Sequence, residues 1–209
     1  MDTVDNLFIG IAGTIGAGKS TLAKSLGEHL GIDVYYEPVV DNEYLEDFYR
    51  STKQYSFAMQ IYLLNRRFQQ HQEIIWRNRP AVQDRTIYED SVFAKMLADI
   101  GLMDQRDYRT YLQLFRNMSN FMCKPNVIIY LDVDPERSFE RVQKRSRGVE
   151  TGITMEYLTA LHREYESFVE DISKIVPLIR VSWNEYRDVE EMAAVIKREY
   201  LDQSFLRRA

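Results

Sequence analysis

The sequence predicts an α/β fold in which a five-stranded parallel sheet is flanked by helices. Five short apolar runs lie between longer segments whose apolar residues recur at helical spacing. The first run leads into a glycine-rich phosphate-loop motif, which requires a strand before it and a helix after it. With 209 residues, of which 45% are hydrophobic, the chain suits one domain. We therefore predict a single domain over residues 1–209.

The phosphate loop over residues 13–20 follows an apolar run that begins at Leu7. Gly13, four residues, then Gly18, Lys19 and Ser20 fit the pattern G-x-x-x-x-G-K-[ST]. Glycines let the backbone wrap its N–H groups around phosphate oxygens, the lysine adds a positive charge, and the serine hydroxyl can bind Mg²⁺. The motif predicts binding of a nucleoside triphosphate. The expected contacts are Gly13, Gly16, Gly18, Lys19, Ser20 and Thr21.

The first half of the chain places two acids at strand ends. The predicted elements are a helix over 19–30, a strand over 34–37, helices over 41–49 and 55–76, and a strand over 80–84. The second strand ends in Glu37 before Pro38, and the third ends in Asp84. Ligands of open α/β sheets bind at the carboxyl ends of strands. We expect both acids to face the phosphate loop, with Asp84 placed to reach Mg²⁺.

The second half contains a cluster of arginines. We predict helices over 86–101 and 107–121, a strand over 127–133, a helix from Asp134-Pro135, a helix over 155–175, a strand over 178–181 and a helix over 189–200. Arg141, Arg145 and Arg147 fall within seven residues at the end of one helix. Such a cluster is costly by mutual repulsion unless anions meet it. It suits an arginine-rich lid, at about residues 141–152, over transferring phosphates.

Composition excludes several classes of protein. The net charge of −5 argues against a nucleic-acid surface. Cys123 is the single cysteine, which excludes an internal disulfide and favours a reducing compartment; we expect it in the core or on a helix. The sequence predicts no membrane span or targeting leader, and hence a cytoplasmic protein. His29, His71 and His162 lack metal-ligand spacing and are expected on helix surfaces.

Several motifs in one order resemble the deoxynucleoside kinases, which include deoxycytidine, deoxyguanosine and bacterial deoxyadenosine kinases. The resemblance extends from about residue 7 to residue 175. The matching pieces are the phosphate loop, Glu37-Pro38-Val39, Phe57-Ala58-Met59-Gln60, Asp84-Arg85-Thr86 followed by Asp90, and the arginine lid with Glu150. The resemblance implies a phosphate-loop kinase fold, with ATP as phosphate donor and Mg²⁺ as cofactor.

The resemblance also implies the catalytic residues. Glu37 is expected to accept the proton of the nucleoside 5′-hydroxyl, and Arg85 to hold Glu37 and the 5′-oxygen in line. Lys19 and the three lid arginines are expected around the phosphoryl oxygens. Ser20 and Asp84 are expected to hold Mg²⁺. The family triplet is commonly Glu-Arg-Ser, and the shorter acid here leaves open whether the contact with the metal is direct or through water.

A second group of residues is implied in substrate recognition. Gln60 would hydrogen-bond the base edge, with Arg67 and Asp90 as a charged pair, although a glutamine and an arginine on a helix more often lie at the surface. A carboxylate there favours adenine, guanine or cytosine over thymine. Tyr49 and Glu150 match the family's residues for the sugar 3′-hydroxyl. Likeness to bacterial members favours purine deoxynucleosides and leaves deoxycytidine open.

Two other functions remain open at this point, and the resemblance suggests an assembly. A nucleoside monophosphate kinase of the thymidylate type shares the phosphate loop and the lid. A non-catalytic nucleotide-binding regulatory subunit is also compatible, because the loop by itself indicates only binding. The family likeness implies a homodimer in which helices 55–76 and 107–121 of each subunit form a four-helix interface.

Overall fold

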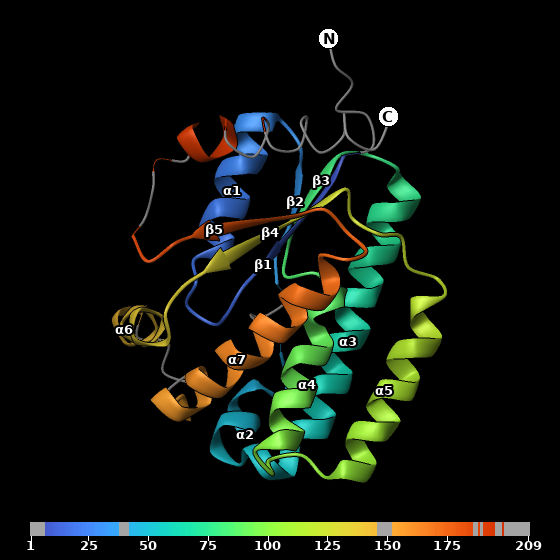
Figure 1. Ribbon diagram of the computed structural model, residues 1–209. Coiled ribbons are helices and arrows are strands. Elements are labelled where there is room, and N and C mark those ends of the chain that lie inside the picture. The colour runs from blue at the N-terminus through green and yellow to red at the C-terminus, as the bar shows by residue number, and fades with distance from the viewer. Residues whose placement is uncertain are drawn as a thin grey trace.

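A parallel sheet forms the centre of the computed structural model, which describes residues 7–37, 42–145, 152–185, 188, 190–194 and 198. The strands are β1 (Phe8–Ala12), β2 (Asp33–Tyr35), β3 (Ala81–Asp84), β4 (Val127–Asp132) and β5 (Leu178–Ser182). They lie in the order β2-β3-β1-β4-β5 and every pair is parallel (Figure 1). The predicted α/β fold with a five-stranded parallel sheet is confirmed.

The three middle strands are buried on both faces. All residues of β1 and β3, and the first five of β4, are buried. β1 lies between the other two, so that Ile9 pairs with Val82 on one side and Val127 on the other. Continuous apolar runs of this kind are typical of parallel strands covered by helices on both faces. The first run therefore places the phosphate loop at the middle of the sheet.

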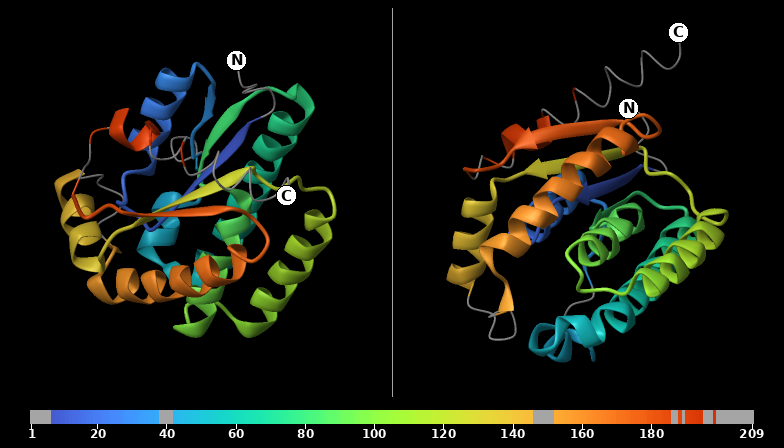
Figure 2. Two further views of the ribbon diagram at one scale, coloured as in Figure 1. Left: turned by 45° about the horizontal axis from the view of Figure 1, so that its top comes forward. Right: turned by 60° about the horizontal axis from the view of Figure 1, so that its bottom comes forward.

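Helices cover both faces of the sheet and form three layers (Figures 1 and 2). Leu22 and Leu26 of α1 pack on one face with Ile9 and Ile11. The other face packs against α3, α4 and α7, which contribute residues to one large apolar cluster. The helices are α1 (Lys19–Leu30), α2 (Leu45–Arg50), α3 (Thr52–Arg77), α4 (Asp90–Asp99), α5 (Gln105–Ser119), α6 (Pro135–Arg145) and α7 (Met155–Ile172).

Three boundaries in the structure differ from those predicted. Residues 42–44 form a turn, because Asn42 Oδ1 accepts from the Tyr44 N–H at 3.0 Å, and α2 begins only at Leu45. The first turn of the predicted helix 86–101 is a 3₁₀ turn over Ile87–Glu89, capped by Thr86, and α4 begins only at Asp90. Glu37 lies beyond the end of β2 rather than within it. Of the predicted helix 189–200, residues 190–194 and 198 are described and are helical.

None of the helices in the described part of the chain combines the length and apolar character needed to cross a membrane. The described part of helix 189–200 packs beside the strands, because Met192 and Ala193 are buried with Trp183 and α1. The lid segment 146–151 lies outside the described residues.

Candidate active site

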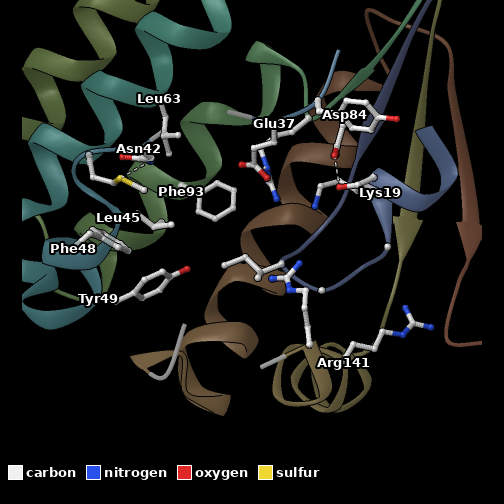
Figure 3. A pocket seen from close by; sticks show the side chains of 18 of the residues that line it. Lys19, Glu37, Asn42, Leu45, Phe48, Tyr49, Leu63, Asp84, Phe93 and Arg141 are labelled. Carbon is white, nitrogen blue, oxygen red and sulfur yellow. Dashed lines mark hydrogen bonds and ion pairs between the residues drawn. The ribbon is translucent and has the colours of Figure 1, made fainter. Parts of the chain in front are cut away.

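One cavity of about 590 Å³ opens where β1, β2 and β3 end (Figure 3). The phosphate loop follows β1, Glu37 follows β2, and Asp84 ends β3. The cavity therefore lies at the carboxyl ends of the strands, where ligands of open α/β sheets bind. Predicted site residues that line it are Gly16, Gly18, Lys19, Ser20, Thr21, Glu37, Tyr49, Gln60, Asp84, Arg85, Arg141 and Arg145.

The phosphate loop packs tightly against α6. Gly16 has a φ of +79°, and a Cβ added there would lie 2.8 Å from the carbonyl oxygen of Ser138. Only glycine meets both conditions without strain. Gly18, with a φ of 94°, precedes the first turn of α1. The loop therefore presents its backbone and the N-terminus of α1 to the cavity, which is the arrangement that binds phosphate groups.

Lys19 is buried against the backbone of the phosphate loop. Its Nζ donates to the carbonyl oxygens of Gly13, at 3.0 Å, and Thr14, at 2.8 Å. Burial, together with the nearby Arg85 guanidinium, lowers the pKa of Lys19 to about 8, and Asp84 and Glu37 offset only part of this effect. The ammonium group is thus held in place before any phosphate binds, and its charge is more easily lost than that of an exposed lysine.

Ser20 and Asp84 form a site whose chemistry fits Mg²⁺. The Ser20 hydroxyl donates a hydrogen bond of 2.5 Å to Asp84 Oδ2. The other carboxylate oxygen, Oδ1, is buried and has no hydrogen-bond partner among the described residues. A buried carboxylate oxygen without a donor is costly. Oxygen ligands beside bound phosphates are what Mg²⁺ prefers, so this pair fits the predicted metal.

Glu37 is held between two arginines that come from different parts of the chain. Its Oε1 lies 2.6 Å from Arg67 Nη2 and 3.0 Å from Arg85 Nε. Burial by itself would raise the pKa of Glu37, but Arg85 and Arg67 outweigh it and lower that pKa to about 2. The carboxylate is thus ionised at neutral pH and its position is fixed, while a quarter of its side chain stays exposed to the cavity.

The other end of the cavity is apolar and lies between α2, α3 and α4 (Figure 3). Gln60 is 3% exposed and lines it from α3. Asn42 Nδ2 donates to the sulfur of Met59 at 3.4 Å. The remaining lining side chains at this end are Leu45, Phe48, Tyr49, Leu63 and Phe93. An apolar slot with a buried amide can hold a planar heterocycle and form hydrogen bonds with its edge.

Arg67 and Asp90 form the predicted charged pair, and both are buried. Arg67 Nη1 donates to Asp90 Oδ1, and the side chains are each 2% exposed. Burial would lower the pKa of Arg67, but Asp90 and Glu37 outweigh it and raise that pKa. Neither residue lines the cavity. They lie behind its wall, so the structure links them to the cavity through Glu37.

The arginines of α6 have different surroundings. Arg141 donates to three backbone carbonyls, those of Ala17 at 3.3 Å, Trp183 at 2.7 Å and Asn184 at 3.0 Å. It therefore ties α6 to the phosphate loop and to the segment after β5. Arg145, one turn further along, lines the cavity. Arg147 and Glu150 were predicted to complete the site, and they lie outside the described residues.

Sequence reasoning missed Glu89 and Tyr165, which are both fully buried beside Arg85. The spacing Thr86-x-x-Glu89 is a capping-box signal that would have placed Glu89 at a helix start. Two other expectations were wrong. His71 is buried rather than exposed, because its Nε2 accepts from the Cys123 N–H at 3.0 Å. Cys123 is exposed and follows α5, because only its backbone is held by that contact.

Comparisons with known proteins agree with this geometry. A family model described as deoxynucleoside kinase matches residues 9–204. A deoxyadenosine kinase of Dictyostelium discoideum is 53% identical over 98% of this chain and 83% of its own length. A deoxyadenosine/deoxycytidine kinase of Bacillus subtilis is 39% identical over 87% of this chain and 84% of its own. The structure of M. mycoides deoxyadenosine kinase with dCMP and dCDP matches with a TM-score of 0.85 and 33% identity, over 94% of this chain and 100% of the other.

Proposed function

The chain belongs to the deoxynucleoside kinase family, and we propose that it transfers the γ-phosphoryl group of ATP to the 5′-hydroxyl of a purine deoxynucleoside, deoxyadenosine first. One observation carries this activity. A fixed carboxylate, Glu37, and the ammonium group of the phosphate-loop residue Lys19 line the same cavity, whose far end is an apolar slot. An acceptor hydroxyl and a donor phosphate can therefore meet within it.

In this reaction the protein supplies position and charge. Phosphoryl transfer passes through a loose transition state, so alignment and neutralisation of charge do most of the catalysis. Glu37 accepts a hydrogen bond from the 5′-hydroxyl, and its pKa of about 2 makes it an orienting base that takes the proton late in the transfer. Arg85 holds that carboxylate, and Lys19 and Arg145 meet the phosphoryl oxygens.

Ser20 and Asp84 would hold Mg²⁺ beside the phosphate loop. When bound, the metal would neutralise charge on the β- and γ-phosphate oxygens. Oδ1 of Asp84, which has no hydrogen-bond partner among the described residues, supports this assignment.

The names of the relatives support a preference for purine deoxynucleosides with some tolerance of deoxycytidine. The Dictyostelium discoideum relative is named a deoxyadenosine kinase, and the Bacillus subtilis relative a deoxyadenosine/deoxycytidine kinase. Adenine and cytosine both carry an exocyclic amino group beside a ring nitrogen acceptor. The amide of Gln60 can accept from the first and donate to the second. Thymine lacks that pair, so thymidine is expected to be a poor acceptor.

Initial rates test this function. ATP and Mg²⁺ are supplied with deoxyadenosine, deoxyguanosine, deoxycytidine, thymidine and each monophosphate in turn. We expect deoxyadenosine to give the highest kcat/KM and the monophosphates to give none. Turnover of monophosphates alone would support the thymidylate-type alternative. Binding of ATP without any turnover would support a regulatory subunit instead.

We also propose a homodimer formed by α3 and α5, which lie side by side (Figure 1). Large apolar side chains are exposed there, namely Trp76 at 77%, Leu114 at 39% and Phe121, just after α5, at 72%. Large apolar side chains exposed on neighbouring helices can mark a surface for association. Light scattering after size exclusion should give a dimer for the wild type and a monomer for Trp76→Glu/Leu114→Glu. Ile175→Glu, which also replaces an exposed apolar residue, should remain dimeric; a monomeric wild type would contradict the proposal.

A further inference from the structure

A buried glutamate and a buried tyrosine surround the guanidinium of Arg85. Arg85 Nη1 donates to the Tyr165 hydroxyl, and that hydroxyl donates to Glu89 Oε2. Arg85 Nη1 also lies 3.3 Å from the same glutamate oxygen. Glu89 and Tyr165 are both 0% exposed, and neither lines the cavity. They cannot touch a substrate, so any effect they have on the reaction acts through Arg85.

Glu89 also holds the backbone on both sides of the site. Its Oε1 accepts from the Thr86 N–H at 3.0 Å, and its Oε2 accepts from the Gly13 N–H at 3.3 Å. The first bond fixes the turn that follows Arg85. The second fixes the first glycine of the phosphate loop. One carboxylate therefore sets the position of Arg85 relative to the loop that binds the donor.

The backbone of Arg85 needs this support. Its φ is +68°, a left-handed backbone conformation that residues other than glycine, asparagine and aspartate rarely adopt. Such a residue persists where the surrounding structure holds it by several contacts. Here the contacts are the ion pair with Glu37, at 3.0 Å, the bonds to Glu89 and Tyr165, and Phe93, whose ring centre lies 4.6 Å from the guanidinium carbon.

We propose that Glu89 and Tyr165 are positioning residues, which hold Arg85 in line with Glu37 and the phosphate loop. The inference rests on the proposed function, in which Arg85 holds the acceptor end of the reaction. Tyr165 sets the direction of one Arg85 nitrogen through its hydroxyl. Glu89 supplies a negative charge beside the Arg85 guanidinium and fixes the position of Arg85 relative to Gly13.

Tyr165→Phe is the main test, because it removes only the hydroxyl and keeps the packing. The ring stacks on Tyr130, with ring centres 5.9 Å apart, and meets Phe93 and Phe168 edge on. We expect kcat to fall about tenfold, since misplacement of a catalytic group has effects of this order or larger. KM for deoxyadenosine should stay within about twofold, because Tyr165 does not line the cavity and the base slot is unchanged. Glu89→Gln should lower kcat further, by about a hundredfold.

Tyr130→Phe is the matched control. It removes the hydroxyl of Tyr130, the other ring in the same stack. That hydroxyl lies 3.4 Å from Glu166 Oε1 and away from Arg85. Its kcat should equal that of the wild type. The melting temperatures of both tyrosine variants should stay near the wild-type value, which keeps the test valid if Glu89→Gln fails to fold.

The Arg85→Lys background separates positioning from general packing. If Tyr165 acts through the guanidinium, adding Tyr165→Phe to Arg85→Lys should lower kcat no further. Wild-type kcat in Tyr165→Phe, or an equal loss in both backgrounds, would overturn the inference while leaving the kinase assignment intact. A wild type that phosphorylates no deoxynucleoside would overturn the proposed function itself, and with it the role of Arg85.

Discussion

Glu37 Oε1 lies 3.0 Å from Arg85 Nε, an ion pair that joins the segment after β2 to the segment after β3. The same carboxylate oxygen lies 2.6 Å from Arg67 Nη2, so two arginines fix one acid. Both arginines are buried, and each is paired with a further carboxylate. Arg85 is paired with Glu89, and Arg67 with Asp90. An acid held on two sides is ionised and has a single orientation. These are the properties required to align an acceptor hydroxyl.

Replacing Glu37 with glutamine should remove turnover and leave nucleoside binding nearly unchanged. An amide cannot take up the proton that the 5′-hydroxyl releases, and general bases contribute about 10²- to 10⁴-fold to rates. We expect kcat to fall about 10³-fold, while the Kd for deoxyadenosine by calorimetry changes less than about threefold. Glu166→Gln, which removes an exposed carboxylate paired with Arg180, should have wild-type kinetics. Equal losses of binding and rate would make Glu37 a residue for positioning alone.

Replacing Asp84 with asparagine should raise the Mg²⁺ requirement. The change keeps the size of the side chain and a hydrogen bond to Ser20, but it removes the charge that the metal needs. We expect the Mg²⁺ concentration for half-maximal rate to rise at least about tenfold, and the wild type to lose activity when the metal is chelated. Asp132→Asn alters an acid outside the cavity and should leave this requirement unchanged. A Mg²⁺ dependence in Asp84→Asn equal to that of the wild type would contradict the assignment.

The affinity for ATP should fall as the pH rises above about 8. The pKa of Lys19 in the free protein is lowered to about 8 by burial, so its ammonium loses a proton there. Bound phosphates favour the charged form, and ATP binding must then be accompanied by proton uptake. We expect the Kd for ATP to rise by up to about tenfold per pH unit above pH 8.

Calorimetry in buffers of different ionisation enthalpy measures both the Kd and the proton uptake. Lys19→Arg provides the control, because its guanidinium stays charged over this pH range. Its Kd should be weaker at pH 7 but flat between pH 7 and 9.5. A flat wild-type profile over the same range would show that the phosphates do not depend on the charge of Lys19.

Much of the site could be predicted because its signals are local or lie at strand ends. The phosphate loop is a continuous motif, and Asp84 and Glu37 follow recognisable apolar runs, so their convergence follows from the parallel order of the sheet. Arg67 was harder to interpret. Its helix offers no local reason to bury a guanidinium, and the reason lies in Glu37 and Asp90, which reach it from other segments.

Glu89 and His71 show where such reasoning fails. The capping signal at Thr86 predicts one bond of Glu89, but the bonds to Gly13 and Tyr165 depend on how distant segments pack. His71 lies on α3 in a run of polar residues, and that run suggests a surface position. Its spacing from Leu64 and Ile74 nevertheless places it on the buried stripe of the helix, where its ring contacts Phe8 and Tyr88.

His71 should make the fold sensitive to mild acid. Burial lowers its pKa to about 4, and its Nε2 accepts from the Cys123 N–H, which only a neutral ring can do. An unfolded histidine titrates near 6.5, so between pH 4 and 6.5 the unfolded chain holds a proton that the folded chain lacks. The titration of His71 should therefore lower the free energy of unfolding by about 2 kcal/mol between pH 7 and pH 5.

Urea unfolding of the wild type and of His71→Gln at both pH values measures this contribution. Glutamine has no proton to gain, and its amide oxygen can still accept from the Cys123 N–H, so the variant should lose about 2 kcal/mol less than the wild type on going to pH 5. His29→Gln, at an exposed position of α1, should behave as the wild type does. If His71→Gln loses as much stability as the wild type, His71 is not the source of the acid sensitivity. Glu37 cannot supply a loss between pH 7 and pH 5, because its lowered pKa places its own loss of stability between about 4.5 and 2.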